Sequence, residues 1–456
     1  MRKIIQYMMM ALIAVVLASC ANDISEESTP TVKSNIRFVV DDFPMFEKPS
    51  TRTIGEEDKG KTAWAVGDEI CVKLESKELG TQTATLKYNG VKFEIQDGNS
   101  LCYLDGEPVT AYAYYAPNRR WRNGSLDFKD IYGNPNGTAE FLEATCTVHY
   151  GDNNYVDISF ANATRNYSRL RIATIPKTEI KVDADNFAPT DNPNRLYMTY
   201  TLTSDEKGNA YLYGTFYNNS IVTVKYRGAT LKTYKFSKET ENAKSYVLDA
   251  TVISANSAEE IYSAIKQEVA NSKTAIRLNL ASDAGANEFN AIREAFEKVK
   301  SGTIDLTLIG CKEIPADGLN NQSGELEALK SITLPDVTKI GKKALLFCVY
   351  LEEINTPNVT SIHENAFGGC TNLQKITFGE LTEVKGLSHD YDGILDPGVD
   401  TERINLVLSE NQKVMTKNRQ GNEYFWTPTK EYYKGSVEYG IPSFLEYKFE
   451  SVSLKK

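Results

Sequence analysis

The chain has 456 residues, with 51 Lys and Arg against 61 Asp and Glu, so its formal net charge is −10 at pH 7. An acidic chain without a basic run argues against nucleic acid as a partner. Hydrophobic residues make up 41% and charged residues 25%, which is the composition of an ordinary folded protein, and this length predicts two or three domains.

Residues 1–19 have the pattern of a cleaved signal peptide. Arg2 and Lys3 precede an apolar run over residues 4–17, which is too short to span a bilayer comfortably and has no stop-transfer pattern after it. The sequence Leu-Ala-Ser-Cys at residues 17–20 resembles the lipobox of bacterial lipoproteins, in which the cysteine is acylated. We therefore expect a lipid (palmitate and further acyl chains) on Cys20 that anchors the protein to the membrane. The alternative is an ordinary signal peptide with a chance cysteine.

Residues 20–33 predict a flexible tether, because they are polar, rich in Ser and Thr, and without apolar periodicity. Asp23, Glu26 and Glu27 form an acidic cluster that resembles the surface-export signal of Bacteroidetes lipoproteins, although two residues interrupt it. This match predicts a protein anchored at the outer membrane and exposed on the cell surface.

Residues 34–252 predict an all-β domain with a sandwich fold, and the pattern fits either one sandwich or two subdomains. Short alternating segments recur at residues 36–40, 69–74, 155–160 and 221–226, with turn signals such as Asn89-Gly90 among them. No long helical pattern interrupts this part of the chain.

Three motifs in this β domain resemble the fimbrillin-like family of Bacteroidetes surface proteins. They are residues 64–70 (WAVGDEI) preceded by a Thr-Arg pair at 51–52, the Tyr-rich residues 113–117 that end in proline, and Phe160 followed by residues 168–170. The third match is loose, since the histidine of the family is missing after Phe160. The resemblance covers residues 34–252 and implies a β-sandwich in which Trp64 anchors the core and Gly67-Asp68 form a turn.

From residue 253 the pattern changes to repeats. Seven columns recur between positions 329 and 384 with one common spacing, as Ile does at 332, 354 and 376 and Cys at 348 and 370, and only the Phe347/Gly369 column differs in chemistry. A degenerate copy of the repeat precedes the regular ones, and in it Leu306 is equivalent to Ile332. This copy is longer than the regular repeat, and its additional residues are expected at positions 320–324. Two further strands are aligned by their first apolar residue, Ile304 with Ile276 and Ile404 with Ile376.

The spacing between positions 332, 354 and 376 is typical of a stacked α+β solenoid. The consensus resembles the BspA-type leucine-rich repeats of bacterial surface adhesins. The repeat domain is expected at residues 253–408, with regular repeats at 325–386. Residues 253–310 predict a helical N-terminal cap, in which Ser257 and Glu260 form a capping box before an apolar helix face. Residues 409–456 predict a C-terminal cap of unassigned shape.

No catalytic, cofactor or metal-binding motif is recognised. The three histidines, His149, His363 and His389, are scattered, and His363 is interpreted as a solvated loop residue. Asp390, Asp392 and Asp396 do not have the spacing of a calcium loop and are interpreted as a solvated acidic turn.

Apart from Cys20, the six cysteines show no zinc-ligand spacing and are predicted to be free thiols. Cys348 and Cys370 occupy equivalent positions of adjacent repeats, so a disulfide between them is geometrically conceivable, but we predict both to be reduced.

The outward-facing surface of the repeat strands is therefore the candidate functional site. The residues that alternate with buried Ile and Leu should face outward and stack into a polar ladder, a common ligand surface of repeat proteins: Ser331, Thr333, Glu353, Asn355, Lys375 and Thr377. The alternative is that these are plain solvated strand residues.

These patterns favour a non-enzymatic surface protein that binds a host, bacterial or matrix partner through its repeats. One alternative is an accessory or tip subunit of a fimbrillin-type pilus, with Arg52 as a protease-processing point and other pilus subunits as partners. A second is a glycan-binding surface lipoprotein, and an enzyme is the least favoured.

Overall fold

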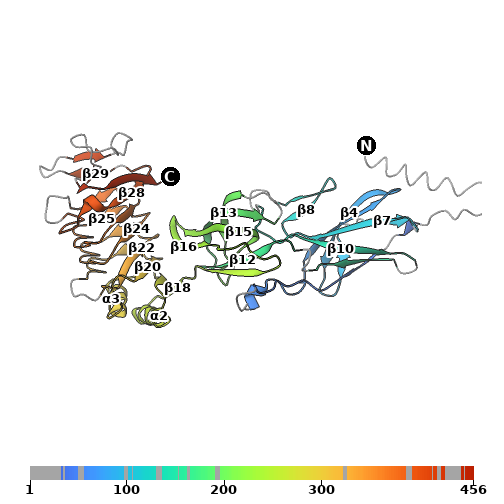
Figure 1. Ribbon diagram of the computed structural model, residues 1–456, viewed down its shortest axis with the longest axis horizontal. Coiled ribbons are helices and arrows are strands. Elements are labelled where there is room, and N and C mark those ends of the chain that lie inside the picture. The colour runs from blue at the N-terminus through green and yellow to red at the C-terminus, as the bar shows by residue number, and fades with distance from the viewer. Residues whose placement is uncertain are drawn as a thin grey trace, which may run out of the picture. The chain divides into compact units, whose positions relative to one another are not determined.

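The computed structural model describes the chain from residue 32 to residue 455 with gaps (Figure 1). The described residues are 32–33, 36–49, 56–96, 101–104, 106–129, 136–151, 154–161, 165–190, 196–321, 326–386, 393–412, 414–417, 423–426, 443–445 and 447–455. Cys20, Arg52 and the proposed signal peptide lie outside them. Within this part of the chain no helix is both long enough and apolar enough to cross a membrane.

The chain divides into two compact units. The first unit holds Met1–Asp42, Trp64–Asp127 and Glu143–Phe160, and the second holds Phe43–Ala63, Phe128–Leu142 and Ala161–Lys456. The two units divide residues 34–252 between them, so the expectation of one β domain with these bounds stays a prediction. The expectation that this half of the chain is mostly β is confirmed.

The first unit is built on a seven-stranded sheet of order β2-β11-β10-β7-β3-β4-β5, in which β2 pairs with β11 in parallel. Its strands are β2 (Arg37–Val40), β3 (Glu69–Ser76), β4 (Gly80–Tyr88), β5 (Phe93–Ile95), β7 (Val109–Tyr115), β10 (Leu142–His149) and β11 (Tyr155–Ser159). The short strands are β1 (Val32–Lys33), which pairs with β6 (Tyr103–Leu104), and β8 (Arg119–Arg122), which pairs with β9 (Ser125–Phe128). The last two residues of the expected tether therefore belong to a strand.

Trp64 is half-buried and packs against aromatic residues of the core of this unit, so it covers the core and is not enclosed by it. Its ring meets the edges of Phe93, Tyr115 and Phe160 at centroid distances of 4.9, 5.4 and 5.7 Å, and its Nε1 donates to the Asp41 carbonyl at 2.8 Å. Gly67 has a φ of 95°, which a side chain would strain, and the amide of Asp68 donates to the carbonyl of Ala65. The predicted turn at residues 67–68 is confirmed.

The second unit begins with an antiparallel sheet in which β12 also pairs with β17 in parallel. The order is β14-β13-β15-β12-β17, and β16 pairs with β15 beside this path. The bounds are β12 (Ser168–Ala173), β13 (Glu179–Pro189), β14 (Leu196–Thr203), β15 (Asn209–Tyr226), β16 (Ala229–Lys235) and β17 (Ser245–Asp249), and the 3₁₀ helix η1 (Glu56–Lys59) lies against β17.

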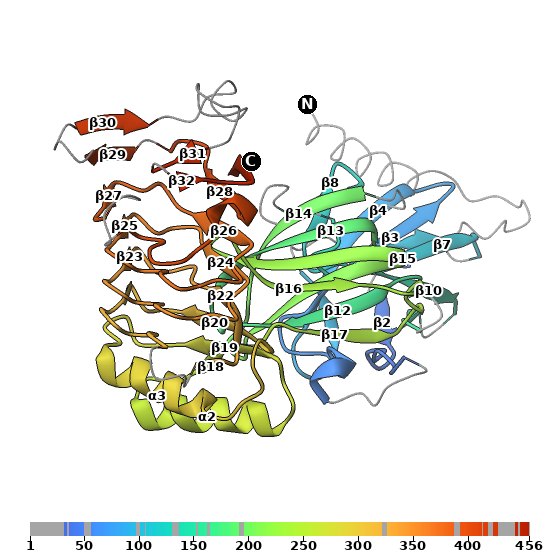
Figure 2. The same cartoon turned by 60° about the vertical axis from the view of Figure 1, so that its left-hand side comes forward.

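The repeats form a parallel sheet of eight strands that climb as successive rungs (Figure 2). These are β18 (Ile253–Ser254), β19 (Ala275–Asn279), β20 (Ile304–Ile309), β22 (Leu329–Thr333), β24 (Glu353–Thr356), β26 (Lys375–Phe378), β28 (Asn405–Ser409) and β33 (Ser451–Lys455). A second parallel sheet contains β21 (Glu313–Ile314), β23 (Lys339–Ile340), β25 (Ser361–Ile362) and β27 (Glu383–Val384).

The strand register confirms the regular repeat, because Ile332 pairs with Ile354 and Ile354 with Ile376. The longer step of the degenerate copy is also confirmed, since Leu306 pairs with Ile332. The alignment of Ile304 with Ile276 and of Ile404 with Ile376 is wrong. Ile276 pairs with Leu306, and Ile376 pairs with Leu406. In both segments the residue that pairs with the preceding strand is not the first apolar residue but the one two positions after it.

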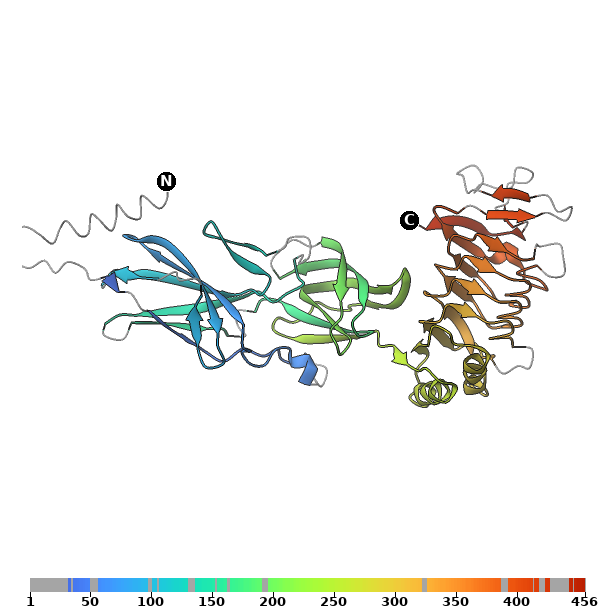
Figure 3. The same cartoon turned by 180° about the vertical axis from the view of Figure 1, so that it is seen from behind.

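Two helices lie at the β18 end of the parallel sheet, with β29 and β30 at the other end (Figure 3). The helices are α2 (Ala258–Ala270) and α3 (Ala286–Phe296), and the remaining short elements are η3 (Thr401–Arg403), β29 (Val414–Lys417), β30 (Glu423–Trp426), β31 (Ser443–Phe444) and β32 (Tyr447–Lys448). The predicted N-cap of α2 is confirmed, but the reciprocal bond of a capping box is not formed, because the Glu260 carboxylate binds the amide of Asn256 and not that of Ser257. The hydroxyl of Ser257 accepts from the Glu260 amide at 3.2 Å, and the Glu260 carboxylate accepts from the Asn256 amide at 2.7 Å.

The Phe347/Gly369 column has a backbone explanation. Both residues lie in the left-handed region, with φ of 60° and 70°. A Cβ on Gly369 would stand 2.3 Å from Cδ1 of Phe347. The phenylalanine ring of one repeat therefore occupies the space that a side chain in the next repeat would need, and glycine leaves that space open.

Candidate binding surface

The predicted ladder consists of two parallel rows across the eight-stranded sheet. The charged row, in strand register, contains Asp305, Ser331, Glu353, Lys375, Asn405 and Ser451. The threonine row contains Thr307, Thr333, Asn355 and Thr377. Neighbouring strands lie about 4.8 Å apart, so each row presents side chains at that spacing.

The charged row is open to solvent. Lys375 Nζ lies 2.7 Å from Glu353 Oε1, and both side chains keep more than a third of their surface exposed. Ser331 Oγ donates to Asp305 Oδ1 at 2.6 Å. Because an exposed ion pair contributes only about 0–1 kcal/mol, these groups can exchange their partners for a ligand at little cost.

The threonine row is less accessible than its pattern predicts. Thr377 is only 7% exposed and Thr307 only 8%, so the expectation that Thr377 is part of an exposed ladder is wrong, although the register places it in the same row as Asn355. Arg277, in register with Thr307, donates from Nε to the Leu231 carbonyl of β16 at 2.9 Å. The β15–β16 hairpin therefore lies over this side of the sheet, whereas Thr333 and Asn355 remain half-buried.

The turn of that hairpin is held by the repeats. Arg227 forms an ion pair with Asp336, whose carboxylate is 1% exposed and also accepts from the Gly310 amide at 2.9 Å. Asn358 Nδ2 donates to the Arg227 carbonyl at 3.0 Å. Burial and then the charge of Asp336 raise the pKa of the Tyr226 phenol. No sequence motif marks this contact, since Arg227 and Asp336 lie far apart along the chain.

A second buried charge cluster fixes the segment Phe43–Ala63 to the β12 region. Arg165 Nη2 donates to Glu140 at 2.7 Å and to the Pro44 carbonyl at 3.1 Å. Arg171 Nε lies 2.7 Å from Asp58 Oδ1. Burial raises the pKa of the Glu140 carboxyl, although the Arg165 charge opposes this. Sequence patterns did not predict this cluster.

The histidines do not form a catalytic arrangement among the described residues. His149 Nε2 lies 2.9 Å from Asp157 Oδ2, and its ring stacks on Tyr155. His363 is half-buried, and its Nε2 has no hydrogen-bond partner within the described chain, so the expectation of a solvated loop side chain is wrong. Burial lowers the pKa of His363, and the charges of Lys385 and Lys339 lower it further. His389 lies outside the described residues.

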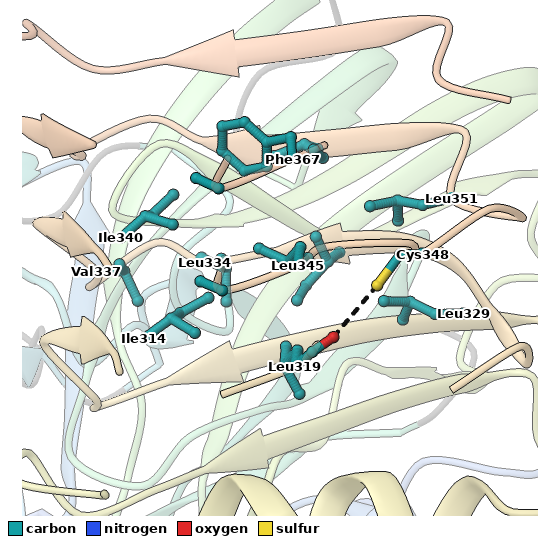
Figure 4. Packing of buried hydrophobic residues seen from close by; sticks show 14 of the residues in the cluster. Ile314, Leu319, Leu329, Leu334, Val337, Ile340, Leu345, Cys348, Leu351 and Phe367 are labelled. Carbon is teal, nitrogen blue, oxygen red and sulfur yellow. Dashed lines mark hydrogen bonds between the residues drawn. The ribbon is translucent and has the colours of Figure 1, made fainter. Parts of the chain in front are cut away.

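The six cysteines of the described chain are free, as predicted. The thiol of Cys348 donates to the Leu319 carbonyl at 3.3 Å (Figure 4), and that of Cys370 donates to the Leu345 carbonyl at 3.2 Å. Over the described residues no group of three or more His, Cys, Asp or Glu side chains is placed to hold a metal ion. Asp390 and Asp392 lie outside that range, and Asp396 Oδ2 accepts from the Tyr447 hydroxyl at 3.2 Å.

Residues 320–388 match the BspA type Leucine rich repeat region, in six copies. This match confirms the predicted BspA-type repeats. A search of curated proteins found no match.

Three solved structures show distant similarity. A candidate cell adhesion protein from Bacteroides fragilis is 11% identical over 48% of this chain and 93% of its own, with a TM-score of 0.23. The fimbrial anchor protein Mfa2 from Porphyromonas gingivalis is 12% identical over 44% and 81%, with a TM-score of 0.20. The shaft pilin SpaA from Lactobacillus rhamnosus GG is 10% identical over 48% and 97%, with a TM-score of 0.18. TM-scores this low carry no conclusion, so the fimbrillin-like resemblance rests on the sequence motifs.

Proposed function

We propose that the chain is a cell-surface adhesion or interaction protein that is lipid-anchored through Cys20 and binds a host, bacterial or matrix partner through its repeats. The observation that carries this proposal is the charged row, an exposed array in which donors and acceptors follow one another from strand to strand. A repeating polar surface on a rigid sheet offers many weak contacts that add up over a large partner.

In this proposal the repeats form a solenoid that begins near residue 253. The apolar faces of α2 and α3, with Ile261, Ile265, Phe289 and Ile292 all buried, support a cap that shields the first strands. Strand β33 supports the expected C-terminal closure, because Ser451–Lys455 pair in parallel with β28. The proposed bounds of the β domain, 34–252, and of the repeat domain, 253–408, follow from the sequence pattern.

The binding test compares two exposed ion pairs in the full-length chain. The double variant Glu353→Ala/Lys375→Ala removes the centre of the charged row, and Glu297→Ala/Lys298→Ala removes a more exposed pair at the end of α3, as a control for the loss of an ion pair elsewhere. Binding to immobilised fibronectin, laminin and collagen and to a glycan array is measured by surface plasmon resonance. We expect the row variant to bind its ligand about tenfold more weakly and the control to bind normally. Uniform failure of the unaltered chain to bind either class would overturn the proposal.

The anchor is tested separately. We expect the Cys20→Ala variant to lose incorporation of a clickable palmitate analogue and to leave the membrane fraction. Proteolysis of intact cells should degrade the unaltered chain if it is exposed on the surface. A chain protected from protease until the cells are lysed would contradict surface exposure.

A pilus accessory or tip subunit is the alternative, supported by a groove in the first unit. Strands β2 and β5 are the two edges of the seven-stranded sheet, and a cavity of about 540 Å³ is lined by residues of both, including Phe38, Val39 and Phe93. Free sheet edges accept an added strand. High-molecular-weight ladders of the chain in surface extracts, lost in an Arg52→Ala variant, would favour this function; a chain that runs only as a monomer would contradict it.

A further inference from the structure

The second unit contains a cleft with a local surplus of positive charge. It has a volume of about 810 Å³ and is bounded by the start of β13, the β15–β16 turn and loops of the repeats. The charged side chains that line it are the cations Lys177, Lys181, Lys225, Arg227 and Lys312 and the anions Glu179 and Asp336. Glu206 pairs with Lys177 at 2.9 Å and Asp183 pairs with Lys225, so the five cations exceed these four anions by one positive charge, in a chain whose net charge is −10.

Lysines of the cleft lie close to one another despite the repulsion between their charges. Lys181 of β13 lies directly opposite Lys225 of β15 in the antiparallel register, and like charges in that position destabilise a sheet. Lys455 Nζ donates to the Gly228 carbonyl at 3.4 Å, and burial and then the charge of Lys225 lower the pKa of its ammonium. Asp183 accepts from Lys225 at 2.6 Å and so offsets only part of this charge.

The buried carboxylate of Asp336 organises the cleft. It holds the guanidinium of Arg227 from one side, and Lys312 Nζ stands 3.8 Å from it, with about half of the lysine side chain exposed. Guanidinium and ammonium groups that are fixed in this way are suited to bind carboxylate or sulfate groups. Thr178, Thr338 and Tyr226 line the same cleft and add hydroxyl groups and an aromatic ring.

We propose that this cleft binds an acidic saccharide, with its carboxylate or sulfate groups at Lys181 and Lys312 and its hydroxyls at the threonines. This inference rests on the proposed adhesion function and names a ligand class for it. The volume lies within the range of about 300–1,000 Å³ that small-ligand sites occupy. An acidic peptide is less suited, because β13 and β15 are each paired on both sides and offer no free edge for strand addition.

The test is calorimetric titration of the full-length chain with four probes. These are a heparin tetrasaccharide, a hyaluronan hexasaccharide, which carries carboxylates without sulfates, the neutral maltohexaose, and hexaglutamate. We expect one or both acidic saccharides to bind, maltohexaose not to bind, and the affinity to fall as the salt concentration rises. The double variant Lys181→Glu/Lys312→Glu should weaken binding at least about tenfold.

The control variant Lys298→Glu/Lys300→Glu makes the same charge change at positions after α3, outside the cleft, and should bind normally. The milder Lys181→Gln/Lys312→Gln, with an unchanged circular dichroism spectrum, should also lose affinity, which excludes misfolding as the cause. Absence of binding by both acidic saccharides, equal loss in the control, or hexaglutamate binding as tightly as heparin would each overturn the proposal. If only this test fails while the charged-row variant still loses its partner, the adhesion function stands without this cleft.

Discussion

The ion pair between Arg227 and Asp336 gives the sharpest prediction, because it joins the β15–β16 turn to the repeats. The Asp336 carboxylate is buried and the Arg227 side chain is 53% exposed. Replacement of Asp336 by Ala removes the acceptor of the Gly310 amide as well as the partner of Arg227. Replacement of Arg227 by Ala leaves Asp336 with that amide and with Lys312.

The magnitudes follow from these contacts. Loss of a charge-assisted hydrogen bond to a partly buried amide costs about 1.5–3 kcal/mol. The pair itself contributes about 1 kcal/mol, since solvent screens the exposed guanidinium. We therefore expect a lower free energy of unfolding by about 2–4 kcal/mol for Asp336→Ala and about 1 kcal/mol for Arg227→Ala. The double variant should lose about 1 kcal/mol less than the sum of the two.

Urea unfolding followed by circular dichroism measures this coupling energy. Two compact units predict two transitions, and the coupling is read from the transition of the second unit. The exposed pair Asp400 and Arg403 provides a matched cycle in which we expect a coupling of less than about 0.5 kcal/mol. A coupling within about 0.3 kcal/mol of zero for Arg227 and Asp336 would refute the argument that this pair holds the hairpin on the repeats.

Three further predictions concern the repeats. Ile354→Ala, at a fully buried rung, should lower the free energy of unfolding by about 2–5 kcal/mol in the same urea assay, and a loss below about 1 kcal/mol would contradict the register. Gly369→Ala should cost about 1–2 kcal/mol through its positive φ and more through contact with Phe347, so its cost should shrink in a Phe347→Ala background. Burial lowers the pKa of His363 in the folded chain. The contribution of this residue to the free energy of unfolding should therefore be at its full value above about pH 6.5 and decrease as the pH drops through the folded pKa. In thermal unfolding, the His363→Gln variant should lack this pH dependence.

The repeats were predictable because successive strands of the parallel sheet bury an apolar side chain at the same position. A buried isoleucine is required at every step, so Ile332, Ile354 and Ile376 mark the register without knowledge of the fold. The longer steps are harder to align, because an additional apolar residue, Ile304 or Ile404, precedes the residue in register. The Phe347/Gly369 mismatch could not be interpreted from chemistry, since what the two residues share is a left-handed backbone.

The accessibility of the candidate surface was only partly predictable. Alternation along a strand tells which side chains leave the core, and it correctly placed Glu353 and Lys375 in solvent. It cannot tell what lies above the sheet. Thr377 is buried on a side of the sheet that β16 approaches, and the cationic cleft combines residues near 180, 226 and 336 that no local pattern connects.

Attachment of cells that display the chain tests the central claim most directly. Cells carrying the unaltered chain, Glu353→Ala/Lys375→Ala or Glu297→Ala/Lys298→Ala are counted on a surface coated with the partner identified in the binding test, with surface levels matched by antibody. Adhesion through the charged row predicts that the first and third strains attach equally and that the second falls to the level of cells without the protein. Attachment of the second strain at the level of the first would contradict it.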